Sequence, residues 1–305
     1  MTESLLQQFS AEREALVASV IPRAVAVAVA RHRVLSGIHW RGAYVITAAE
    51  TLGGADRVRV TWPETAGPEE SAEGEIVASD LTTDVAVIRT GGPRAAEITT
   101  RESLRLGESV AIAGRGAHGP IVSWGVVSVA GPGWRSRRGG DIAQRIEIAA
   151  RLDDRLEGAL VADTAGRIAA MLVPGPRGRA LGIPASTIER VLQSIERHGY
   201  LPRPYLGVRL QTLWIDSTTA ARFGRRSRRA AVVAGVEIGS PAAGAGLEPG
   251  DLIETMGGEE VDGVDAVMRA LVRSQVGSAI EVGLRRGGDL QTRSVTVGEQ
   301  PRDAR

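Results

Sequence analysis

Few residues in this sequence could carry out nucleophilic chemistry, and they are unevenly placed. The chain has no cysteine, which excludes thiolate catalysis, disulfide bonds and cysteine-ligated metal sites. From residue 137 to residue 185 the only side-chain hydroxyl is that of Thr164. A serine hydrolase needs a hydroxyl, a base within hydrogen-bond reach and donors that face the oxyanion. The candidate bases are four scattered histidines, His32, His39, His118 and His198.

The composition is that of a globular protein of about two domains. The chain has 305 residues, 43% of them hydrophobic and 24% charged, and its net charge is +1. A molecule so close to neutral has no overall field that would attract nucleic acid or a membrane. The apolar stretch 15–30 is interrupted by Pro22 and Arg23, and no uninterrupted run of 18 apolar residues occurs. These features predict a cytoplasmic protein without a membrane span.

Short apolar segments between glycine-rich turns dominate the chain from about residue 24 to residue 183. Ala24–Ala30 alternates valine with alanine, which is the period of a strand. Many short strands with turns between them favour an all-β sandwich or barrel. The other segments of this kind are Tyr44–Thr47, Val58–Thr61, Val85–Arg89, Ser109–Ala113, Gly125–Val129, Arg145–Ala149 and Arg167–Val173.

Helical patterns precede and follow these strands. A first helix that ends at Pro22 is predicted from apolar residues at helical spacing: Leu5, Leu6, Phe9 and Leu16. Ser186 and Glu189 form a capping box for a second helix. After Pro204 the chain alternates between strand and helix. The expected strands are Leu206–Leu210, Ala231–Val236, Leu252–Met256, Ala279–Arg285 and Thr292–Val297, with helices at Ala242–Gly246 and Val264–Arg273.

Four motifs in this order are specific when taken together. Val45–Ala49 and Thr83–Val87 lie in the strand-rich part, and Tyr205–Val208 and Gly239–Ala243 lie in the second part. They resemble motifs of the HtrA/DegP family, in which the first two segments carry a catalytic histidine and aspartate and the last two build a peptide-binding domain. The resemblance implies a mainly β chain, a trypsin-like double six-stranded β-barrel followed by an α+β PDZ domain. The implied boundaries are an N-terminal helix 1–22, the barrels 23–185, a linker helix 186–202, the PDZ domain 203–299 and a tail 300–305.

Two of the three catalytic positions implied by the resemblance hold residues of different chemistry. Glu50 stands at the histidine position and Leu156 at the serine position, or Glu157 if the alignment shifts by one residue, whereas Asp84 is kept. The loop 153–157 also holds bulky charged residues where glycines let two N–H groups face an oxyanion. We therefore expect a chain that is not an enzyme, with no catalytic residue, cofactor or metal.

The same alignment gathers carboxylates at the vacated site. Glu50 and Asp84 are expected beside one or more of the loop acids, Asp153, Asp154 and Glu157. We expect them to form ion pairs with Arg151 or Arg155, with cation binding as the alternative. A two-carboxylate hydrolase built from Glu50 and Asp84 is a further alternative.

The PDZ-like part keeps the residues that the resemblance assigns to peptide binding. The loop Tyr205, Leu206, Gly207 and Val208 is expected to direct N–H groups at a terminal carboxylate, and the strand through Leu210 to pair with the peptide backbone. Four apolar residues recur at helical spacing and either line a side-chain pocket or belong to the core. They are Val264, Val267, Met268 and Leu271.

Protein or peptide C-termini are therefore the expected partners. The arginine-rich segments near Trp134 and at Arg222–Arg229 (Arg222, Arg225, Arg226, Arg228 and Arg229) are predicted to be solvated loops or protein contacts rather than a nucleic-acid site. We expect the apolar face of the first helix either to hold together a homo- or hetero-oligomer, for example a trimer, or to pack against the barrel of its own chain.

The function that follows is a catalytically inactive HtrA-like pseudoprotease. It would bind proteins as a scaffold or complex subunit through its PDZ domain and barrel surface. The alternatives are an HtrA-type serine endopeptidase whose active site is unforeseen or completed by a partner, and a chaperone-like holdase.

Overall fold

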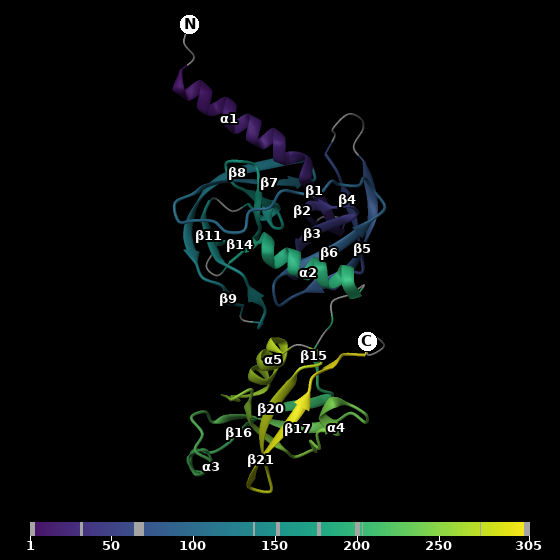
Figure 1. Ribbon diagram of the computed structural model, residues 1–305, viewed down its shortest axis with the longest axis vertical. Coiled ribbons are helices and arrows are strands. Elements are labelled where there is room, and N and C mark those ends of the chain that lie inside the picture. Colours follow the sequence, from purple (N-terminus) through teal and green to yellow (C-terminus); the bar gives the residue numbers. More distant parts are fainter. Residues whose placement is uncertain are drawn as a thin grey trace. The chain divides into compact units, whose positions relative to one another are not determined.

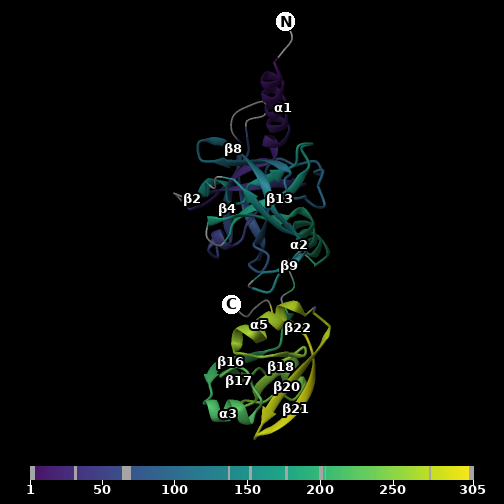
Figure 2. The same ribbon diagram turned by 90° about the vertical axis from the view of Figure 1, so that its left-hand side faces the viewer.

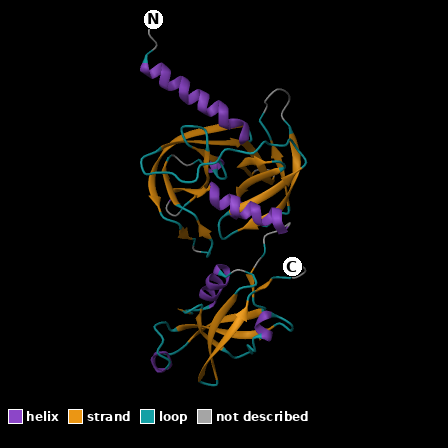
Figure 3. Ribbon diagram, in the orientation of Figure 1, coloured by secondary structure: helices purple, strands orange, loops and turns teal. Residues whose placement is uncertain are grey.

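The computed structural model describes residues 4–30, 33–63, 70–136, 138–150, 153–175, 178–198, 202, 204–274 and 276–301. The chain divides into two compact units, one of residues 1–136 and 141–201 and one of residues 137–140 and 202–305 (Figure 1). Strands dominate both units (Figure 3). His32 and Arg151, which entered the sequence predictions, lie outside the described residues.

The first unit begins with a six-stranded barrel that closes in the order β1-β2-β3-β6-β5-β4. The alternation of β1 places Val25 and Val27 inside, where they pack with Val60 and Ile88. Between β3 and β4, a single 3-10 turn η2 (Glu50–Leu52) follows the end of β3. The strands are β1 (Ala24–Ala30), β2 (Arg33–Arg41), β3 (Tyr44–Ala48), β4 (Arg57–Thr61), β5 (Ser71–Asp80) and β6 (Val85–Thr90).

A second six-stranded barrel closes in the order β11-β14-β13-β12-β7-β8. Its strands are β7 (Ser109–Gly116), β8 (Gly119–Gly131), β11 (Arg145–Ala149), β12 (Leu160–Ala162), β13 (Ile168–Pro174) and β14 (Ala180–Pro184). A small two-stranded sheet of β9 (Trp134–Arg135) and β10 (Asp141–Ile142) stands apart, and the 3-10 turn η3 (Asp154–Leu156) precedes β12. The prediction of a mainly β chain with two closed barrels is confirmed.

Two helices frame this unit. Helix α1 (Leu5–Val20) begins with a capping box of Ser4 and Gln7 and ends at η1 (Ile21–Arg23). Its first turns expose Phe9 and the two leucines before it, whereas Leu16 packs on the barrel core. The oligomer contact expected for this face therefore stays a prediction.

Helix α2 (Ala185–His198) lies against strands of both barrels (Figure 1). Its apolar stripe, which includes Ile188 and Leu192, joins a core cluster with Ile38 of the first barrel and Met171 of the second. Glu189 accepts hydrogen bonds from Trp40 Nε1 and from Arg41, so its carboxylate ties the helix to β2.

The second unit has a six-stranded sheet, in which β16-β17-β18-β20-β21 follow one another and β19 pairs with β18, and a separate two-stranded sheet of β15 and β22 (Figure 2). The main strands are β16 (Val208–Trp214), β17 (Arg229–Val236), β18 (Leu252–Met256), β20 (Ala279–Arg286) and β21 (Asp289–Thr296). The short strands are β15 (Pro204–Tyr205), β19 (Glu259–Glu260) and β22 (Gly298–Glu299), and the helices are α3 (Ser217–Arg222), α4 (Pro241–Gly244) and α5 (Val264–Arg273).

Two local expectations for this unit are corrected. The strand expected at Leu206–Leu210 begins only at Val208, because Gly207 adopts a positive φ of 75° that breaks the extended backbone. Arg225, expected in a solvated loop, is buried. Its guanidinium forms an ion pair with Glu254 and donates to the carbonyl of Val261. A buried charge of this kind requires such partners.

Candidate active site and peptide-binding edge

Asp84 lies in the turn that leads into β6. It is the one non-glycine residue with a positive φ, 59°, in the part of the chain that the structure describes. Such a conformation costs energy and is common at functional sites. Its Oδ1 accepts a hydrogen bond from the backbone N–H of Glu50 at 2.8 Å. The pKa of Asp84 is raised to about 6, mainly by burial and also by the negative charges of Glu50 and Glu157, while the hydrogen bond from the Glu50 N–H opposes the rise. This carboxyl group can therefore gain and lose a proton near neutral pH.

Glu157 brings a loop of the second barrel to this carboxyl group. The hydroxyl of Thr51 in η2 donates to the Glu157 carboxylate, and the backbone N–H of Ser36 in β2 donates to the Glu157 carbonyl at 3.0 Å. A Cβ at Gly158, where φ is 81°, would lie 2.2 Å from the Ser36 carbonyl oxygen, so only glycine allows this approach. The loop is thus held against the first barrel, with Glu157 close enough for its charge to act on Asp84.

The loop 153–159 has a leucine, which has no hydroxyl, at position 156, and the backbone N–H groups of residues 155–159 are already hydrogen-bonded within the protein. Leu156 is 1% exposed and packs in the core of the second barrel. Each backbone N–H from residue 155 to residue 159 donates to a protein acceptor: Asp153, Asp154, Leu156 or Leu172. In this conformation, none of these five groups is free to stabilise the oxyanion of a serine-type reaction.

The acidic residues expected at this site separate into two groups. Asp153 forms a bidentate ion pair with Arg155, as the ion-pair prediction anticipated for one loop acid. Glu157 is the loop residue whose charge acts on Asp84 together with Glu50. Within the described ranges, no group of three or more histidine or acidic residues is arranged to hold a metal ion.

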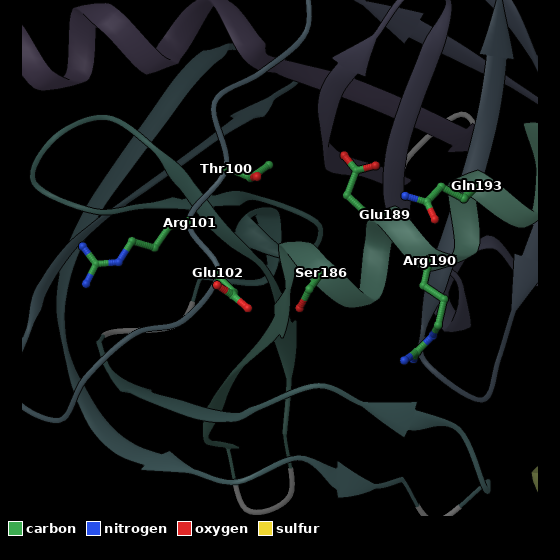
Figure 4. Close-up of a pocket in the computed structure, with 7 residues that line it drawn as sticks. All are labelled: Thr100, Arg101, Glu102, Ser186, Glu189, Arg190 and Gln193. Carbon is green, nitrogen blue, oxygen red and sulfur yellow. The ribbon is translucent and has the colours of Figure 1, made fainter.

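A separate pocket of about 380 Å³ lies between the segment 100–102 and α2 (Figure 4). Three of its charged residues, Arg101, Glu189 and Arg190, already have partners. Arg101 pairs with Asp163 and Glu108, and Arg190 donates to the carbonyl of Asp141. Its lining includes none of the residues around Asp84, so it is not part of the candidate active site.

In the second unit, the predicted carboxylate-binding loop has a fixed orientation. The carbonyl of Leu206 accepts from the N–H of Ala242 at 2.9 Å, and that of Gly207 accepts from the N–H of Glu237 at 2.8 Å. In a trans peptide the C=O and the following N–H point in opposite directions, so the N–H groups of Gly207 and Val208 point away from these partners. Tyr205 donates its hydroxyl to the Glu237 carboxylate at the base of the loop.

The strand after this loop is an edge of the sheet. β16 pairs with β17 along one side, and the sheet order ends at β16. Helix α5 packs beside it, because the hydroxyl of Thr212 accepts from the N–H of Val264 at 3.2 Å. We call this strand side the peptide edge. Sequence reasoning missed Thr212, whose only signal was the glycine turn at Gly263 that brings the helix start within reach.

The four apolar residues predicted on α5 fall on different faces. Val267 and Leu271 are buried in the core with Leu206. Met268 is 50% exposed, and Val264 is half-buried, as are Val208 and Leu210 on β16. The pocket predicted for a peptide's last side chain stays a prediction. Of the four residues, only Val264 and Met268 are exposed enough to contact such a side chain.

Comparison with known proteins agrees with both units. Residues 35–171 match the trypsin-like peptidase domain family and residues 204–297 match the PDZ domain family. The chain is similar to the serine protease HhoB of Synechocystis (28% identity over 272 residues, 85% of this chain and 64% of that protein). It is also similar to a DegP-like periplasmic serine endoprotease of Rhizobium meliloti (28% identity over 243 residues, 76% of this chain and 47% of that protein). The chain thus spans about half to two thirds of the length of these relatives.

Solved structures are similar to this chain over both units. The HtrA-type protease AlgW with a tripeptide is 26% identical with a TM-score of 0.60, and 94% of this chain and 96% of that chain are covered. A serine endoprotease from Yersinia pestis, 21% identical, has the same fold with a TM-score of 0.64 over 94% of this chain and 98% of that chain. These findings show that the chain is similar to HtrA-type proteases, with one segment like a trypsin-like peptidase domain and a second like a PDZ domain.

The relatives correct two of the sequence predictions. The expectation that the chain is not an enzyme is wrong, since the curated relatives are named as serine proteases. That expectation treated two substituted positions as decisive, although peptide hydrolysis needs only an activated nucleophile, which can be water between carboxylates.

The expected cytoplasmic location is contradicted as well, because relatives are named as periplasmic enzymes. Net charge and mean hydropathy do not determine the compartment to which a protein is exported. Among the described helices, none is long and apolar enough to cross a membrane.

Proposed function

We propose that this HtrA-like chain is a periplasmic endopeptidase that binds protein C-termini at its PDZ domain and hydrolyses peptide bonds with the carboxyl groups around Asp84. The observation that carries the proposal is the placement of Asp84, which accepts a hydrogen bond from the N–H of Glu50 while the Glu157 loop is held against the same barrel. Burial and the charges of these two glutamates raise its pKa to about 6. A carboxyl group that is protonated in mild acid and has a second carboxylate within reach of the same substrate can supply an acid and a base together. The names of the relatives support hydrolysis of proteins as the reaction class.

The reaction needs no hydroxyl from the chain. A water molecule attacks the peptide carbonyl while its proton passes to Glu50, whose side chain is exposed. Protonated Asp84 gives its proton to the amide nitrogen as the carbon–nitrogen bond breaks. Glu50 and Asp84 then exchange a proton with solvent to restore the starting state. Glu157 acts through Asp84, because its negative charge keeps the proton on that carboxyl group.

The PDZ domain would supply binding rather than chemistry. A peptide that pairs with the open side of β16 extends the sheet by one strand, and its terminal carboxylate meets the N–H groups of the Gly207 loop. The solved HtrA-type protease AlgW with a tripeptide supports a peptide ligand of this kind.

The experiment is cleavage of unfolded casein by the full chain between pH 4.5 and 8.5. We expect activity that falls as the pH rises above about 6, because Asp84 then loses the proton that the leaving nitrogen requires. A serine-directed phosphonate inhibitor should leave the activity unchanged. Asp84→Asn should lower it by about 100-fold or more, the scale of a general acid.

The matched control is Asp154→Asn, which removes an exposed carboxylate from the loop that carries Glu157. It should retain activity close to that of the unaltered chain. Casein that stays intact at every pH would overturn the proposal. Cleavage that the phosphonate blocks would also overturn it, since a hydroxyl nucleophile elsewhere in the chain would then carry the reaction.

A further inference from the structure

The outer residues of β16 alternate between the two faces of the sheet. The face toward α5 carries Val208, Leu210, Thr212 and Trp214, as the hydrogen bond between Thr212 and the start of α5 establishes. Three of these residues are half-buried beside the helix. Trp214 is 74% exposed, because α5 begins level with Thr212 and leaves the last residue of the strand uncovered.

Arg229 lies beside Trp214 on the same face. The two residues are cross-strand partners in the pairing of β16 with β17. The Arg229 guanidinium reaches the start of α5, where it lies 3.6 Å from the carboxylate of Asp265, so it is on the helix side of the sheet. Both partners of this ion pair are partly exposed, and such a pair contributes little stability. Trp214 and Arg229 thus form a surface beyond the helix, which we call the Trp214 surface.

The strand geometry says which part of a peptide reaches this surface. A peptide added antiparallel to β16, with its terminal residue opposite Val208, places each preceding residue opposite the next residue of the strand. The register irregularity in this pairing lies on β17, so β16 itself stays regular from Val208 to Trp214. Trp214 is then opposite the peptide residue six positions before the terminus. Directly opposed side chains point to the same face, so this residue lies against the indole.

We infer that the peptide edge extends past α5 to a subsite at the Trp214 surface, which takes an aromatic or long aliphatic side chain six residues before the peptide's carboxyl terminus. The inference rests on the proposed peptide binding and adds an upstream specificity to it. An exposed indole on an edge strand gains most from an opposed aromatic or aliphatic side chain, because that contact removes apolar surface from water.

The test measures binding of fluorescently labelled ten-residue peptides to the full chain by anisotropy. The peptides end in valine, leucine or phenylalanine and carry either phenylalanine or serine six positions before the end. We expect the phenylalanine peptides to bind about 3- to 10-fold more tightly, the range for an aromatic pair. In Trp214→Ala this preference should disappear. Leu213→Ala, which shortens the adjacent side chain on the opposite face of the same strand, should retain it.

The outcomes separate the inference from the proposed function. If no peptide with a free carboxylate binds better than its amidated form, peptide binding at this domain is wrong, and the subsite is wrong with it. If the peptides bind but phenylalanine and serine are equivalent, or Trp214→Ala keeps the preference, only the subsite is overturned. A Trp214→Ala variant that changes self-association and not peptide affinity assigns the surface to a second copy of the chain and also overturns it.

Discussion

Replacing Asp84 by asparagine should make the protein more stable at neutral and alkaline pH. The ordinary pKa of the aspartate carboxyl is 3.8 and that of Asp84 is raised to about 6, because the folded protein disfavours its charge. An acid whose pKa is raised by folding has no effect on stability while it is protonated in both the folded and the unfolded chain, and it destabilises the fold once it ionises. It therefore costs stability as the pH rises from about 4 to above 6. At 1.36 kcal/mol for each pKa unit, the cost at pH 8 is about 3 kcal/mol.

Asparagine removes this cost and keeps the local structure. Its side-chain oxygen can accept the hydrogen bond from the N–H of Glu50, and asparagine is among the residues that tolerate a φ of 59°. We expect a gain of about 2–3 kcal/mol in the free energy of unfolding at pH 8, shrinking through pH 6 and vanishing near pH 4. Activity should fall in the same variant, since a strained and desolvated acid is what the reaction requires.

Urea unfolding at pH 8, 6 and 4.5, followed by tryptophan fluorescence, measures this effect. The barrel unit holds four of the five tryptophans, Trp40, Trp62, Trp124 and Trp134, so a Trp214→Phe background restricts the signal to that unit. Comparing the two proteins at each pH cancels the titration of all other groups. A gain of equal size at pH 4.5 and pH 8 would refute the reasoning, because it would come from packing. A loss at pH 8 would refute it too.

Other changes give equally definite results. Gly158→Ala should lower the thermal midpoint by several degrees and abolish casein cleavage, because the new methyl group collides with the Ser36 carbonyl and displaces the loop that holds Glu157. Burial lowers the pKa of His39, whose Nδ1 accepts a hydrogen bond from Trp62 Nε1 at 3.0 Å. The free energy of unfolding should therefore fall as the pH drops below about 6.5, and it should fall less in His39→Gln. Urea midpoints at pH 7.5 and 5.5 measure this difference. Gly207→Ala should abolish peptide binding in the anisotropy assay, because a side chain opposes the positive φ of the carboxylate loop.

Element types and the two-part architecture could be predicted from the amino-acid sequence. The valine–alanine alternation of β1 and the apolar stripe of α2 carry the periods of strand and helix, and they form those elements over nearly the expected residues. The span Arg145–Ala149 is the same in the sequence prediction and in the structure. Periodicity succeeds here because both barrels need an apolar inner face on every strand.

The environment of each side chain, in contrast, follows from the folded arrangement. Asp84 was singled out by its motif, but the charge of Glu157 raises the pKa of Asp84 only because Thr51 and Ser36 hold the Glu157 loop against the first barrel. Helical spacing alone does not tell which residues of α5 lie in the core and which at the surface, because buried and exposed positions are neighbours around the helix. This applies to Val264, Val267, Met268 and Leu271. The exposure of Trp214 depends on where α5 begins, and that is set by a contact between residues 52 positions apart in the chain. Local sequence encodes the period of an element, whereas desolvation and charge proximity depend on neighbours that only the folded chain brings together.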